Sequence, residues 1–67
     1  MKLREIHSMI EAKEITLSVV GELKFKVFKP TYENRTPAIL QACIDYGERE
    51  VECIYPAELG CMCISVK

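Results

Sequence analysis

The chain contains no tryptophan and only one histidine, so two residue types that are common in small active sites are scarce. That histidine, His7, lacks an evident nucleophile, and nucleophilic catalysis needs a nucleophile and a base within hydrogen-bonding reach. The three glycines are isolated, which excludes a glycine-rich phosphate-binding loop. We therefore expect no catalytic residue and no enzymatic activity.

Long apolar runs are also missing. No run approaches the roughly 20 residues that cross a bilayer, and residues 1–5 (MKLRE) lack the apolar core of a signal peptide. We therefore expect a cytoplasmic protein without membrane contact.

A strong charge of either sign is absent as well, because nine Lys and Arg residues stand against ten Asp and Glu residues, for a net charge of −1. Such a balance gives no general attraction to nucleic acid. The exception is a short basic stretch that contains Lys24, Lys26 and Lys29. It suggests a weak nucleic-acid binder, which is the weakest of three functional hypotheses.

The overall composition is that of a globular domain. Of the 67 residues, 49% are apolar and 28% are charged, and a chain of this length forms one domain at most. We expect a single domain over residues 1–67.

Two segments have the periodicity of amphipathic helices, residues 2–12 and residues 37–46. For the second, Thr36 is the expected N-cap and Gly47 the residue that ends the helix. Almost all of its side chains are apolar, so we expect this helix to be buried on several sides.

Residues 14–28 alternate between apolar and polar side chains around a glycine, which predicts a β-hairpin. Opposed residues share a face of the sheet. Matching the apolar sets places Val19 opposite Leu23 and Leu17 opposite Phe25, with a three-residue loop between the strands.

A second hairpin is expected over residues 50–66. Apolar matching favours a register with Cys53 opposite Met62 and buried beside Ile64. The alternative register, with a loop one residue longer, would place Cys53 opposite Cys63.

Together these elements predict an α+β fold in the order α-β-β-α-β-β, with a four-stranded, mainly antiparallel sheet and both helices packed on one face. The other face is expected to be mixed, and on it Lys24 and Lys26 would pair with Glu50 and Glu52.

Four cysteines are present, and Cys61-Met62-Cys63 is the most compact group. Without a signal segment we expect free thiols. A thiol or zinc-binding module using Cys61 and Cys63 is the second hypothesis. The expected register places Cys53 on the opposite face and Cys43 on a helix, so four ligands would not converge, and we predict neither a metal nor another cofactor.

The leading hypothesis is a non-enzymatic protein-interaction or regulatory accessory module, acting as a homodimer or bound to a partner protein. Small inhibitors from phages and mobile elements share this size, which is an analogy of size alone. Leu40 and Ile44 are expected to project away from the sheet and to need another cover. The full set of predicted interaction residues is Val20, Phe28, Leu40, Ile44, Ile54, Cys61 and Cys63.

Overall fold

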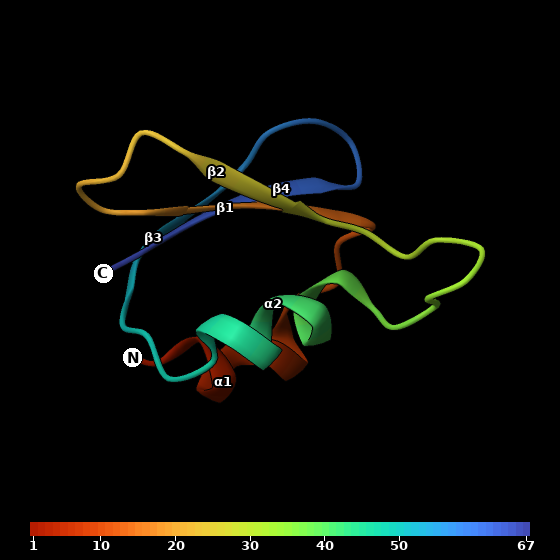
Figure 1. Ribbon diagram of the computed structural model, residues 1–67, viewed down its shortest axis with the longest axis horizontal. Helices are drawn as coiled ribbons and strands as arrows, with labels where there is room; N and C mark the ends of the chain where they lie inside the picture. Colours follow the sequence, from red (N-terminus) through yellow and green to blue (C-terminus); the bar gives the residue numbers. More distant parts are fainter.

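The computed structural model describes residues 1–67 and has two layers, a four-stranded sheet and a layer of helices beneath it (Figure 1). The elements are α1 (Leu3–Ile6), the 3-10 helix η1 (His7–Met9), β1 (Glu14–Val19), β2 (Phe25–Phe28), α2 (Ala38–Tyr46), β3 (Val51–Pro56) and β4 (Cys61–Val66). The strand order is β2-β1-β4-β3, with β1 and β4 parallel and the two outer pairs antiparallel. The predicted α+β class and the predicted element order are confirmed.

The first helix is shorter than predicted. It ends at Ile6 and continues as a single 3-10 turn to Met9, instead of reaching residue 12. The backbone amides of Lys13 and Glu14 both donate to the carbonyl of Gly60, at 2.8 and 3.2 Å. These bonds to the loop before β4 fix the start of β1, and residues 10–12 connect it to η1 without helical structure.

Helix α2 spans Ala38–Tyr46, and its N-cap is Pro37 instead of Thr36. The helix is followed by Gly47, as predicted. A Cβ atom on that residue would lie 2.6 Å from the carbonyl oxygen of Cys43. Glycine is therefore needed at this position because the backbone passes too close for a side chain.

Ten buried aliphatic side chains form the core between the two layers. They are Leu3, Ile6, Ile10, Ile15, Leu17, Ala38, Ile39, Ala42, Ile64 and Val66. The sheet contributes only through its two central strands, so the edge strands β2 and β3 add no fully buried residue.

The register of the first hairpin differs by one residue from the prediction. Phe25 lies opposite Ser18 instead of Leu17. The chain turns at residues 19–22, where the amide of Glu22 donates to the carbonyl of Val19 at 2.9 Å. Strand pairing resumes only at Phe25, so the connection between β1 and β2 is longer than the predicted three-residue loop.

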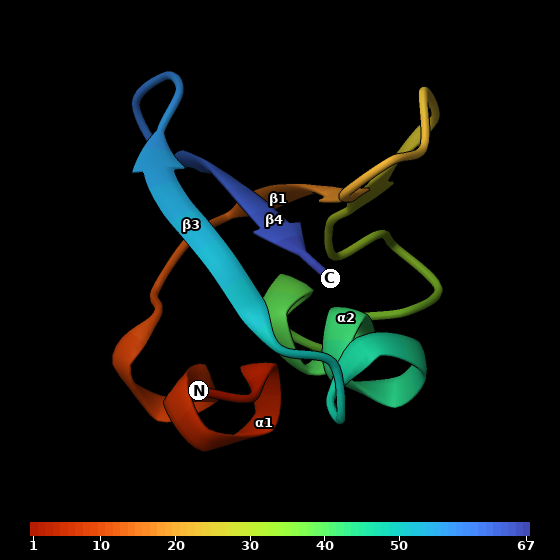
Figure 2. The same cartoon turned by 90° about the vertical axis from the view of Figure 1, so that its left-hand side faces the viewer.

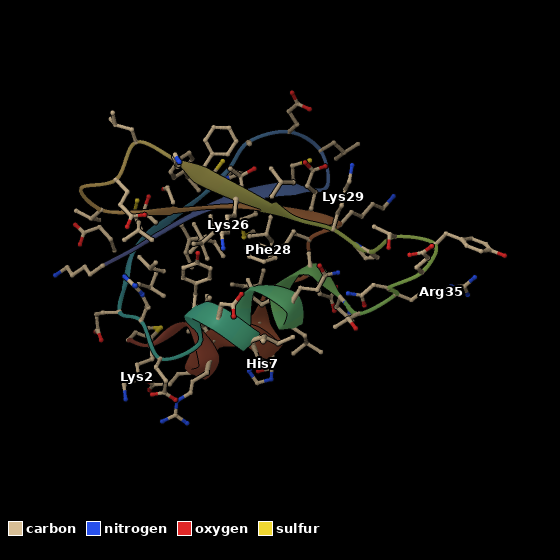
Figure 3. The ribbon with its side chains drawn as sticks, viewed as in Figure 1. Lys2, His7, Lys26, Phe28, Lys29 and Arg35 are labelled. Atoms are coloured by element: carbon tan, nitrogen blue, oxygen red, sulfur yellow. The ribbon has the colours of Figure 1, made fainter.

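A shift of one residue moves every side chain of a strand to the other face. Phe25 and Val27 therefore point away from the helices, whereas Lys26 and Phe28 point toward α2 (Figure 3). The Phe28 ring is half-buried and meets the ring of Tyr46 edge-on, with the centroids 6.2 Å apart.

The register of the second hairpin is also different, and the predicted burial of Cys53 against Met62 is wrong. Cys53 is exposed and lies opposite Ser65. A β-bulge between Val51 and Cys53 shifts the alternation, so that Val51 returns to the covered side opposite Val66. Ile54 consequently faces the helices.

The β3 edge of the sheet is partly covered. Near its start, the amide of Val51 donates to the carbonyl of Met1 at 2.8 Å, and Lys2 forms a bridge with Glu50. Glu48 also lies 2.8 Å from Arg4 and 3.1 Å from Lys2, and the hydrogen bond from Lys2 and the charge of Arg4 lower the pKa of Glu48. These contacts tie the N-terminal segment and α1 to the segment that leads into β3.

Candidate protein-interaction surface

The sheet face that points away from the helices has no covering layer (Figures 1 and 2). The strand registers assign its side chains. They are Glu14, Thr16 and Ser18 of β1, Phe25 and Val27 of β2, Cys53 and Tyr55 of β3, and Cys61, Cys63 and Ser65 of β4. We call these ten residues the open face.

The largest side chains of the open face lie on the two edge strands. Phe25 is 65% exposed, Val27 is 46% exposed and Tyr55 is 52% exposed. Apolar groups that share one surface and lack a cover within the chain are typical of a protein-interaction site.

Both hairpin loops lie on the same side of the sheet as the open face, one near each end (Figure 2). Their tips carry Leu23 and Leu59, and both side chains are fully exposed. The apolar surface therefore continues onto the loops at either end.

Several predicted interaction residues need correction. Cys61 and Cys63 belong to the open face, as predicted, and Val20 is exposed in the first hairpin loop. Phe28 and Ile54 do not belong to it, because the shifted registers turn both toward the helices, opposite Ile15 and Ile64 respectively.

Leu40 and Ile44 of α2 are exposed, as predicted, at 41% and 80%. With Met9 they are exposed apolar residues of the helical layer, and the sheet separates them from the open face. Their part in an interface stays a prediction.

All four cysteines are free thiols. Partial burial raises the pKa of Cys61, and the nearby carboxylates of Glu14 and Glu58 raise it further. Burial also raises the pKa of Cys43. No three His, Cys, Asp or Glu side chains lie where they could hold one metal ion, and the thiol or zinc hypothesis stays a prediction.

Of the three lysines of the basic stretch, Lys26 lies in β2, Lys24 precedes the strand and Lys29 follows it. Lys24 and Lys26 line a small hollow next to Tyr46, and the Lys26 ammonium lies 5.5 Å from the centre of that ring. Hydrogen bonding to the Tyr46 hydroxyl raises the pKa of Lys26. Lys29 follows the other end of the strand (Figure 3).

The predicted pairing of these lysines with Glu50 and Glu52 is wrong, because β2 and β3 are the two opposite edges of the sheet. Glu52 instead lies 3.6 Å from the ammonium of Lys67. The nucleic-acid hypothesis stays a prediction.

The largest hollow, about 610 Å³, lies between the segment after η1 and the loop before α2. Ile10, Ala12, Ile39 and Leu40 contribute its apolar lining. Arg35 lies over the ring of Tyr32 at 5.9 Å, and the Nδ1 atom of His7 bonds to the carbonyl of Arg4 at 2.7 Å, so both are engaged with their own neighbours. The side chains of Glu11 and Lys13 also line the hollow.

Neither helix is long and apolar enough to cross a bilayer. Comparison with protein-family models gives no match, and comparisons with curated proteins and with solved structures give none either.

Proposed function

We propose that this chain is a non-enzymatic protein-interaction module of the cytoplasm that binds a protein surface through the open face. The observation that carries the proposal is the position of Phe25, Val27 and Tyr55 on a sheet face without a covering layer. A two-layer α+β fold buries one face of its sheet and leaves the other free for a partner.

The energetic argument rests on the size of these three side chains. Complete burial of a large apolar side chain contributes about 1.5–3 kcal/mol, and each of the three still exposes about half of its area or more. Aromatic residues are also enriched among those that dominate binding energy at interfaces. Phe25 and Tyr55 are therefore the expected anchors of the contact.

The test places a photo-crosslinking phenylalanine analogue at position 55, on the open face. The matched control places the same group at position 32, because Tyr32 is also an exposed tyrosine but belongs to the loop before α2. Each variant is expressed in the protein's own host cells, irradiated, and examined for covalent adducts by mass.

We expect a discrete adduct from position 55 and none at the same yield from position 32. An adduct of twice 7.7 kDa identifies a second copy, and any other mass identifies a partner protein. Equal yields from both positions, or no adduct from position 55, would contradict the proposal.

A further inference from the structure

The open face has a defined relief across its four strands. The two central strands, β1 and β4, carry the small side chains Thr16, Ser18, Cys61, Cys63 and Ser65, which we call the central lane, and all five are half-buried. The edge strands carry the larger Phe25, Val27 and Tyr55, which we call the margins, and β3 also carries the smaller Cys53.

We propose that the open face binds a single amphipathic α-helix of a partner protein, which lies along the central lane with the margins on either side. The inference rests on the proposed function and names the kind of partner. Aromatic and aliphatic margins would contact the flanks of such a helix, and the small central side chains would let it approach the sheet.

The width and length of the open face agree with those of a single α-helix. The margins are three strand spacings apart, or about 14–15 Å, and a helix with its side chains is about 10–12 Å across. Strands β1 and β4 each span six residues. That length is about 20 Å, which a helix covers with about 13 residues.

Two of the three hydroxyls of the central lane are already paired. The hydroxyls of Ser18 and Ser65 bond to each other across β1 and β4 at 3.0 Å. A helix above them would leave this pair bonded, whereas the hydroxyl of Thr16 would need a hydrogen-bond partner from the helix, such as a serine or threonine side chain. Thiols behave as small apolar groups in such contacts.

A second copy of this chain is a poorer occupant. Two open faces packed against each other would bring margin against margin, because each margin lies on an edge strand. The two central lanes would then enclose an empty channel, and a void of that kind forfeits the packing contacts of its lining.

The charged residues at the two ends of the central lane indicate which way the bound helix would run. At one end of the central lane, Glu14 lies opposite Cys61, and Glu58 lies in the adjacent loop. At the other end Lys67 is paired with Glu52. The N-terminal end of a helix carries partial positive charge, so it is expected beside Glu14 and Glu58, with lysine or arginine in its first turns.

The test uses two displayed peptide libraries of the stated length, one constrained as helices and the other as β-hairpins, selected against the whole chain. Binders are then measured against Thr16→Phe, which fills the central lane, and against Ser8→Phe, an exposed control in η1 on the far side of the molecule. Cys63→Phe is a second filling variant, and circular dichroism verifies that each variant is folded. Aromatic residues are favourable in strands.

We expect binders from the helix library whose affinity falls about tenfold or more with Thr16→Phe or Cys63→Phe, since added volume in a packed contact is costly. Their affinity for Ser8→Phe should not change. The same binders should prevent the crosslink from position 55.

The helix proposal is overturned if only the hairpin library gives binders, or if the helix binders ignore both filling variants. In those cases a persistent crosslink from position 55 leaves the proposed function intact. Loss of the crosslink as well would contradict both.

Discussion

Replacement of Ile64 by alanine is expected to destabilise the protein by about 2–5 kcal/mol, the range for removing a buried aliphatic side chain. Ile64 is 1% exposed at the centre of the sheet, between Leu17 on β1 and Ile54 on β3. A domain of this size has a total stability on the order of 3–10 kcal/mol. The variant should therefore be largely unfolded at temperatures that the wild type tolerates.

The matched control is Ile54→Ala, the same chemical change on the paired residue of the same ladder. Ile54 is 39% exposed, so its truncation leaves a smaller void and should cost clearly less. Urea unfolding of both variants measures the two losses. Equal losses would show that the layers are packed differently.

Phe28→Ala is expected to cost about 2 kcal/mol, roughly half of the range for a fully buried phenylalanine. Its half-buried ring packs against the core and against Tyr46. Phe25→Ala is the matched control in the same strand, and since Phe25 is exposed the change should stay within about 0.5 kcal/mol. Thermal or urea unfolding separates the two.

This pair of variants also decides the register of the first hairpin. Apolar matching of the sequence predicts that Phe25 is the buried residue. Under that register, Phe25→Ala would lower the stability more than Phe28→Ala does. The proposed function further predicts that Phe25→Ala weakens binding by the open face while leaving stability intact. Phe28→Ala is expected to lower the stability and to leave binding by the open face unchanged in the fraction that is folded.

The class of fold could be predicted from the sequence because the apolar period changes clearly along the chain. A period near 3.6 over residues 38–46 and periods of two in residues 14–19 and 61–66 correspond to the observed α2, β1 and β4. These are the elements that supply most of the core. Their patterns are strong because each has one face that must be buried.

The strand registers could not be predicted, because the edge strands carry apolar residues on both faces. In β2, Phe25 and Val27 alternate with Lys26 but are followed by Phe28, so either register buries an aromatic ring. Hydrophobic pattern specifies register only where one face alone is apolar. In β3 the bulge, which no residue type announces, adds a further shift.

The candidate site was therefore only partly predictable. Cys61 and Cys63 could be placed because β4 has a consistent covered face through Ile64 and Val66. The proposed anchors Phe25 and Tyr55 were missed because the predicted registers assigned them to the core. Both errors follow from assuming that the largest apolar side chains are the buried ones, whereas in this structure Phe25 and Tyr55 are exposed.

The most direct test of the central claim, that the open face is covered by a protein in the cell, uses the chain's own thiols. Cys53 and Cys63 lie on the open face, whereas Cys43 packs from α2 against the core and is an internal reference. Alkylation rates of the three thiols are measured by mass spectrometry in host cells and with the purified chain. We predict that Cys53 and Cys63 react more slowly in cells, relative to Cys43, than they do in the purified protein. Identical relative rates in the two samples would contradict the claim.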